Sequence, residues 1–216
     1  MYTGPHIITD GLVLALDAAS ERSYPGTGTT WYDLSETKSD WSLPTGVFNA
    51  GTMNYSSDQS SLSPPAAWQN TTDQTIEVWY KPYTGGIHTG CCDTIFGRYY
   101  FRFFQIGSTL YTMIGFNNGS GGSFYGHPAF SVSYDTYHHI LGVRRDNRFI
   151  IWIDGVERYN TAYGTGYDLF NPGETWYIST TRQTNLDISI CRIYNRGLSD
   201  NEILQNFNAQ KTRFGL

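Results

Sequence analysis

The stretch YHHILGVRRDNRFIIWIDGVERYN, residues 137–160, has the most regular pattern in the chain. Positions 139, 141 and 143 alternate with 140 and 142, and positions 149, 151 and 153 alternate with 150 and 152, in the two-residue period of a β-strand. Asp146-Asn147 turns the chain between these runs. Asp154-Gly155 fits a type I′ hairpin turn, because Asp and Gly tolerate positive φ. The stretch therefore predicts a three-stranded antiparallel meander.

The same stretch holds two adjacent histidines and two adjacent arginines, so it could also be read as an active site. No Cys, Ser or carboxylate motif is placed by the sequence to work with His138 or His139. We expect His139 to be an inward, hydrogen-bonded histidine at the start of a strand. Arg144 and Arg145, with Arg148, flank a turn and are expected to be solvated. The stretch is interpreted as the frame of a sheet.

Strand patterns continue on both sides of the meander. In TIEVWYKP (75–82), Ile76, Val78 and Tyr80 face one way, whereas Glu77 and Lys81 face the other way beside Trp79. In residues 185–195, Leu186, Ile188 and Ile190 are expected on one face. Gly97 is expected at a bulge or break. Further strands are predicted at 12–16, 93–107, 109–119 and 175–180, with short ones near 47–48 and 52–55 inside the irregular region 17–74.

The C-terminal stretch LSDNEILQNFNAQ predicts a short helix. Ser199 and Glu202 have the spacing of a capping box. Ile203, Leu204 and Phe207 form one apolar stripe at helical spacing, so the helix is expected to dock on the sheet. The tail KTRFGL is expected to fray, or to anchor a neighbouring subunit through its apolar side chains.

About ten strands and one helix, without βαβ alternation, predict an all-β fold. The expected architecture is a two-sheet antiparallel jelly-roll sandwich with a short C-terminal helix. A chain of 216 residues suits one such domain over 1–216, with an N-terminal arm at 1–11 and the helix at 199–210.

The amino-acid composition limits the classes of partner and the cellular setting that the chain suits. The net charge of −5 argues against nucleic-acid binding, which normally needs a basic face. No apolar run is long enough to span a bilayer, and the first residues lack the basic start and apolar run of a signal peptide. Three cysteines do not suggest a disulfide framework; Cys191 is expected to be a buried thiol, and the state of Cys91-Cys92 stays open.

Three stretches give the chain a recognisable resemblance. TIEVWYKP, the meander, and NLDISICRIYNRGLSDNEI resemble the LamG-like (laminin G/concanavalin A-like lectin/glucanase) jelly-roll family. The N-terminal ITDGLVLALDAASERSYPGTGTTWYDLS resembles members encoded by tailed bacteriophages, especially marine and cyanobacterial ones. Where those members continue with a Gly/Asn-rich turn, this chain has DLSETKSD, which puts any ligand or ion held there in doubt.

The sequence does not predict catalysis. Glucanases of this fold carry an E-x-D-x-x-E strand, which this chain lacks, and Glu77, Asp187 and Glu174 are isolated from one another. A binding module fits better, because sugar sites combine loop aromatics with polar groups. The ligand-binding residues predicted on loops are Trp68, Tyr125, His127, Tyr163 and Tyr167. No cofactor or metal ligand is predicted; calcium held by Asp33, Asp40, Asp58 or Asp93 remains open.

The resemblance implies a non-enzymatic virion protein of a tailed phage, made in the host cytoplasm. It would be a capsid decoration or a fibre- or tail-associated protein, with other virion proteins as partners. The alternative is an adhesin that binds a host-surface glycan, and a glycan hydrolase is a more distant one. The sequence leaves open where on the particle the protein sits, which glycan it would bind and whether it forms a homo-oligomer.

Overall fold

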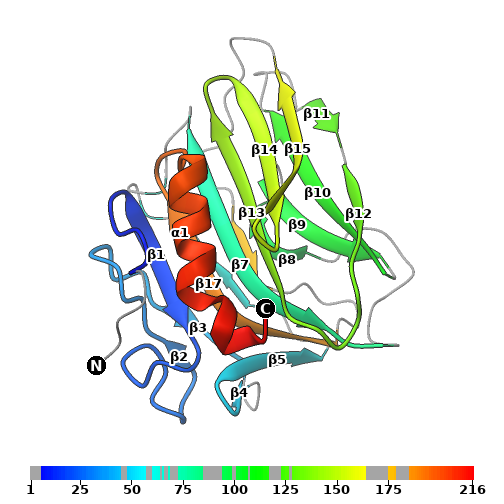
Figure 1. Cartoon of the computed structure of the whole chain (residues 1–216). Helices are drawn as coiled ribbons and strands as arrows, with labels where there is room; N and C mark the ends of the chain where they lie inside the picture. The colour runs from blue at the N-terminus through cyan, green and yellow to red at the C-terminus, as the bar shows by residue number, and fades with distance from the viewer. Residues whose placement is uncertain are drawn as a thin grey trace.

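The computed structural model describes residues 6–44, 48–56, 60–63, 65, 68, 73–84, 94–98, 101–106, 108–116, 123–126, 128–163, 175–178 and 185–216. Over these residues the chain forms two antiparallel sheets packed face to face, with one helix on the outside (Figure 1). The predicted all-β sandwich with a C-terminal helix is confirmed.

The larger sheet has eight strands in the order β15–β14–β13–β7–β17–β5–β4, with β1 also paired to β17. Its strands are β1 (Leu12–Asp17), β4 (Phe48–Asn49), β5 (Thr52–Ser56), β7 (Gln74–Pro82), β13 (His138–Arg145), β14 (Arg148–Ile153), β15 (Val156–Ala162) and β17 (Asn185–Tyr194).

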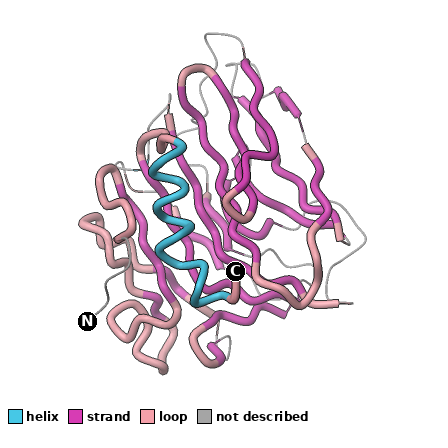
Figure 2. The backbone as a smooth tube through the Cα atoms, in the orientation of Figure 1, coloured by secondary structure: helices cyan, strands magenta, loops and turns pink. Residues whose placement is uncertain are grey.

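The smaller sheet has the order β11–β10–β9–β8–β16–β6, with β12 paired to β10. Its strands are β6 (Ser60–Leu62), β8 (Thr94–Arg98), β9 (Phe101–Ile106), β10 (Thr109–Phe116), β11 (Ser123–Gly126), β12 (Ala129–Ser131) and β16 (Trp176–Ile178). A separate pair, β2 (Thr30–Trp31) and β3 (Trp41–Ser42), completes the strands that the structure describes. The described strands outnumber the ten expected, because two- and three-residue strands are too short for a readable period. Figure 2 shows the strands and the helix along the backbone.

The meander forms as predicted from β13, β14 and β15. Asp146 and Asn147 both have positive φ, at 52° and 56°, and so do Asp154 and Gly155, at 51° and 76°. Two consecutive positive φ angles define a type I′ turn, whose twist matches that of the strands it joins. The chemistry of the turn residues therefore sets the register of the meander.

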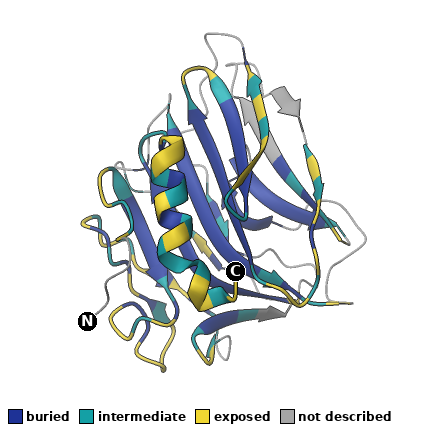
Figure 3. Cartoon of the chain, in the orientation of Figure 1, coloured by how far each residue is buried: buried dark blue, intermediate teal, exposed yellow. Residues whose placement is uncertain are grey.

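The core lies between the two sheets, whose strands are largely buried (Figure 3). Ile76, Val78 and Tyr80 of β7 face it and are fully buried. Gly142 of β13 leaves room for the smaller sheet, because a Cβ there would lie 2.9 Å from Phe101 Cε2. The alternation predicted for β7 is confirmed.

The single-face prediction for β17 is wrong at Ile190. A register shift between Ile188 and Ile190 places Ile190 opposite Trp79, whereas Ile188 lies opposite Tyr80. Directly paired residues share a face, so Ile190 lies on the side of Trp79 and Cys191 enters the core instead. The extra residue at this bulge reverses the alternation along the rest of the strand.

Helix α1 (Asp200–Gln210) covers the outer face of the larger sheet (Figure 1). Its capping box is formed, because Ser199 Oγ accepts from the Glu202 N–H and the Glu202 carboxylate accepts from the Ser199 N–H. Ile203 is fully buried in a second apolar cluster with Leu141, Val143 and Leu198. The predicted docking is confirmed.

A buried polar cluster joins the sheet to α1. The Glu77 carboxylate accepts from Arg192 Nη1 at 2.7 Å, from His139 Nε2 at 3.0 Å and from Asn206 Nδ2 at 3.0 Å. All four side chains are almost completely buried. Burial by itself would raise the pKa of Glu77, but Arg192 and His139 outweigh burial and lower it to about 2. His139 is thus buried and bonded as expected, although it lies beneath the helix rather than between the sheets.

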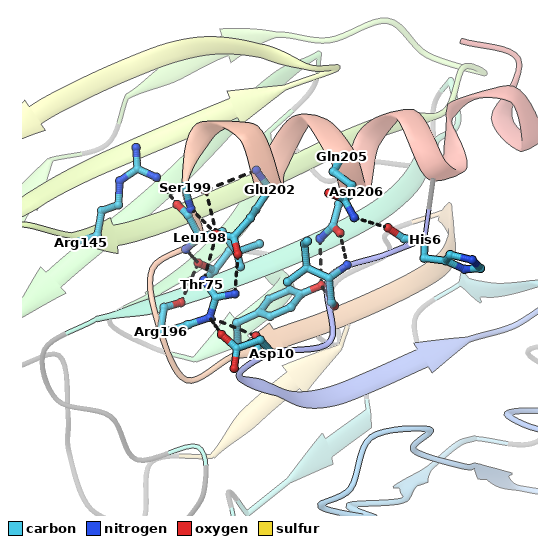
Figure 4. Close-up of polar contacts among 12 residues, drawn as sticks. His6, Asp10, Thr75, Arg145, Arg196, Leu198, Ser199, Glu202, Gln205 and Asn206 are labelled. Carbon is cyan, nitrogen blue, oxygen red and sulfur yellow. Dashed lines mark hydrogen bonds and ion pairs between the residues drawn. The ribbon is translucent and has the colours of Figure 1, made fainter. Parts of the chain in front are cut away.

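The N-terminal arm is hydrogen-bonded to the same helix (Figure 4). Gln205 Nε2 donates to His6 O at 2.7 Å, and Ile8 N donates to Asn206 Oδ1 at 2.8 Å. Tyr194 OH donates to Ile8 O at 3.2 Å. These backbone contacts tie residues 6–8 to both the helix and β17.

Two expectations about exposed basic and terminal residues are wrong. Arg144 is only 3% exposed, and its Nε donates to Tyr163 OH rather than to water. The tail neither frays nor projects: residues 211–214 form a 3-10 turn, and the Phe214 ring stacks on Trp79 with centroids 4.3 Å apart. The Phe214 ring therefore packs on this chain's own sheet, and contact of the tail with a neighbouring subunit stays a prediction.

Candidate functional site

The aromatic residues predicted to bind ligand do not meet at one site. Trp68 is 1% exposed, and its Nε1 donates to Val13 O at 2.8 Å, so it belongs to the core. Tyr163 is 6% exposed and packs on Phe149 and Arg144. Both rings therefore have their partners inside the sandwich, and little of either is exposed to a ligand. His127, Tyr167 and the Tyr125 side chain lie outside the described residues.

Of the loop acids considered as calcium ligands, some are engaged within the fold and others lie outside the described residues. Asp33 is buried and accepts from the N–H groups of Ala15, Ser35 and Ser39 and from Ser35 Oγ. Its carboxylate is therefore surrounded by donors and holds the loop against β1. Asp58 and Asp93 lie outside the described residues, within which no group of three or more His, Cys, Asp or Glu side chains could hold a metal ion.

Ser133, His138 and Asp154 resemble a hydrolase triad in their distances. His138 Nδ1 lies 2.8 Å from Asp154 Oδ2, and Nε2 lies 3.4 Å from Ser133 Oγ. Nε2 is nearer to the Ser133 carbonyl oxygen, at 3.1 Å. Both nitrogens thus face acceptors, and Asp154 raises the pKa of His138 although burial acts to lower it. A histidine held as a donor at both nitrogens cannot take a proton from Ser133.

A cavity of about 590 Å³ lies between the N-terminal arm and the loop after β2, lined by residues 9–13, 34–37 and Asn195. None of these residues is aromatic. The cavity therefore lacks the flat apolar faces on which sugar rings stack.

A group of polar and aromatic side chains is centred on Asp187, and we call it the Asp187 cluster. It comprises Asn54 of β5, Lys81 of β7, Tyr83, Tyr137 and Asp187 of β17. Lys81 and Asp187 lie directly opposite each other on neighbouring strands, so their side chains share the outer face. The tyrosines lie just beyond the end of β7 and just before the start of β13.

Asp187 is the acceptor at the centre of the cluster. Its Oδ2 accepts from Tyr83 OH at 2.7 Å and lies 3.5 Å from Lys81 Nζ, and its Oδ1 accepts from Asn54 Nδ2 at 2.9 Å. Lys81 Nζ also lies 4.6 Å and 5.2 Å from the ring centroids of Tyr83 and Tyr137. The cation is therefore held between two aromatic faces and one carboxylate.

The charges in the cluster stabilise one another. Burial lowers the pKa of Lys81, but the Tyr83 hydrogen bond and the Asp187 charge outweigh burial and raise it overall. Burial and the hydrogen bond to Asp187 raise the pKa of Tyr83. The cluster consequently combines the Lys81 ammonium and the Tyr83 hydroxyl with the side chains of Asp187, Asn54 and Tyr137.

This set of groups suits recognition rather than catalysis. Ammonium, amide and carboxylate groups exchange hydrogen bonds with hydroxyls, and half-buried tyrosines offer stacking faces. Glycoside hydrolysis needs a second carboxylate roughly 5 to 9.5 Å away that can act as an acid. Glu77 lies farther along the same face, but a pKa of about 2 keeps it from donating a proton.

Sequence reasoning noted the residues of the Asp187 cluster only separately. The sequence places Lys81 on the outward face of its strand and leaves Asp187 as an isolated acid 106 positions later. An outward acid and an outward lysine on two predicted strands are a weak signal, because only the pairing of β7 with β17 makes them neighbours.

Comparison with known proteins identifies the fold. The model of the concanavalin A-like lectin/glucanases superfamily matches residues 54–204, which is more than half of the chain. No curated protein sequence matches it.

Solved structures match over nearly the whole chain. The ligand-binding domain of botulinum neurotoxin serotype D in complex with N-acetylneuraminic acid superposes with a TM-score of 0.74 at 12% identity, covering 94% of this chain and 52% of that one. The binding domain of paraclostridial mosquitocidal protein 1 gives 0.70 at 14% identity, with 92% and 52% covered. The chain thus spans about half the length of the structures it matches, and at these identities the likeness concerns the fold.

Proposed function

The chain belongs to the concanavalin A-like lectin/glucanases superfamily, and on that premise we propose that it is a glycan-binding, lectin-like domain whose ligand is held at the Asp187 cluster. The observation that carries the proposal is the placement of Lys81 between the rings of Tyr83 and Tyr137, with Asp187 behind it. Hydrogen-bonding groups and aromatic faces can then contact one ligand from the same surface.

The comparisons add support of a general kind. Two of the similar structures are named as complexes with N-acetylneuraminic acid and with SialylT. A glycan role for this chain would use the same sandwich, with loops and strand ends of its own.

The proposal is tested on a glycan array, followed by calorimetric titration with the glycan that binds best. Tyr83→Ala, which removes one stacking face, is expected to weaken binding by about tenfold, the equivalent of 1.4 kcal/mol. Tyr83→Phe keeps the ring but loses the bond to Asp187, so a smaller effect is expected. Tyr32→Ala is the matched control, because Tyr32 is exposed and lies outside the cluster. Unchanged affinity in Tyr83→Ala would remove the cluster as the site.

We further propose that the domain works on a virus particle, as a decoration or fibre-associated protein. This rests on the resemblance of the stretch from ITDGL to WYDLS to tailed-phage proteins. Particles assembled with and without the chain should differ in binding to host cells if it is an adhesin. If adsorption is unchanged but particle stability falls, decoration is its main role.

We propose that the domain is not an enzyme. The single carboxylate of the Asp187 cluster, the low pKa of Glu77 and the engaged nitrogens of His138 support this. Incubation with the bound glycan, followed by mass spectrometry, should return the glycan intact. Release of shorter sugars, lost in Asp187→Asn, would contradict the proposal.

A further inference from the structure

The C-terminal turn, residues 211–216, lies beside the Asp187 cluster, and Tyr137 joins the two. The centroid of the Tyr137 ring lies 4.7 Å from that of Phe214, and Lys81 Nζ lies 5.2 Å from the Tyr137 centroid. Ser189 Oγ donates to Tyr137 OH at 3.1 Å. Tyr137 is thus held at its hydroxyl by β17 and at its ring by the end of the chain.

Phe214 is itself firmly placed. Its ring stacks on Trp79 with an interplanar angle of 19°, and Trp79 is fully buried. The preceding Arg213 donates from Nη1 to both carboxylate oxygens of Asp17, at 2.8 and 2.9 Å. Gly215, with φ 77°, ends the turn and returns its N–H to the backbone. An aromatic stack and an ion pair therefore fix the turn on the sheet.

Three successive contacts connect the sheet to the candidate site. Trp79 supports Phe214, Phe214 supports one side of Tyr137, and Tyr137 forms one of the two aromatic faces around Lys81. Phe214 reaches the cluster through its ring contact with Tyr137. Its influence on a ligand would pass through the orientation of Tyr137.

We propose that Phe214 is a positioning residue of the glycan site, which holds the Tyr137 ring in place as one wall of the Asp187 cluster. The inference rests on the proposed glycan-binding function. Without the Phe214 ring, Tyr137 gains rotational freedom that a ligand must then remove on binding, and this entropy weakens affinity. The C-terminal turn is accordingly part of the binding site, although it lies far from β5 and β7 in sequence.

The experiment measures the affinity for the glycan selected on the array together with the state of Tyr137. Phe214→Ala is expected to weaken binding about three- to tenfold, the scale of one aromatic contact. It should also shift or broaden the ¹⁹F resonance of Tyr137 in protein labelled with fluorotyrosine. Phe214→Tyr, which keeps the ring, should restore both readouts. Leu216→Ala is the matched control, because Leu216 is in the same turn and is 39% exposed.

The outcomes separate this inference from the function on which it rests. If Tyr83→Ala weakens binding and a folded Phe214→Ala does not, Phe214 has no positioning role, whereas the glycan site stands. If the unaltered chain binds no glycan, the proposed function fails and the positioning role fails with it. Should Phe214→Ala not fold, Arg213→Gln, which loosens the turn without removing a ring, is measured with the same two expected changes; unchanged affinity there overturns the inference.

Discussion

Gly155 meets two requirements at once, positive φ and close approach of a side chain. Its φ is 76°, and a Cβ there would lie 2.6 Å from Phe207 Cδ1 of α1. Gly26 has a similar φ of 89° but no atom within 4 Å of its Cβ position. Comparing substitutions at the two glycines therefore separates the cost of backbone strain from the cost of a steric clash.

We predict that Gly26→Ala lowers the free energy of unfolding by about 1 kcal/mol, the low end for a residue held at positive φ. Gly155→Ala should cost more, because the helix must also shift. Urea unfolding of both variants measures the difference. Equal losses would mean that α1 accommodates the added methyl group freely.

His138 makes stability depend on pH near neutrality. Its folded-state pKa is raised above the unfolded value of 6.5, with Asp154 outweighing burial. The stabilisation is therefore fully present below about pH 6.5 and is lost as pH rises through the higher folded-state value. We predict that the unfolding midpoint of the unaltered chain falls more over this interval than that of His138→Gln. Parallel pH profiles would show that His138 is not charged in the folded protein.

At the scale of elements, the buried polar cluster of Glu77, His139, Arg192 and Asn206 holds α1 on the sheet. Arg192→Met leaves the Glu77 carboxylate buried without its main cation, and removing one partner of a buried pair typically costs about 3–5 kcal/mol. We predict a loss of this size in urea unfolding. The double variant Glu77→Gln/Arg192→Met should recover a large part of it, because no buried charge remains. A double variant no more stable than Arg192→Met would show that packing, not charge, accounts for the loss.

At the scale of the whole molecule, α1 and the sandwich should unfold together. The helix has only 11 residues, which is marginal in water, and its stability comes from Ile203, Phe207 and the Asn206 bonds to the sheet. We predict that circular dichroism at 222 nm and tryptophan fluorescence report one coincident thermal transition. An earlier transition seen only by circular dichroism would mean that the helix detaches first.

Local chemistry determined much of this protein from the sequence alone. Alternation, the Asp-Gly turn and the Ser199–Glu202 capping box identified the meander, the strands around it and the helix, because each depends on residues close in the chain. The sandwich fold and the buried thiol of Cys191 followed from the same patterns.

Only the tertiary structure decided which side chains meet. The bulge near Ser189 reverses one face of β17, Trp68 and Tyr163 turn inward, and Phe214 returns to stack on Trp79. The Asp187 cluster likewise draws on β5, β7, β17 and the segment before β13. Such neighbours are set by strand pairing between distant segments, for which the two-residue period of a single strand contains no information.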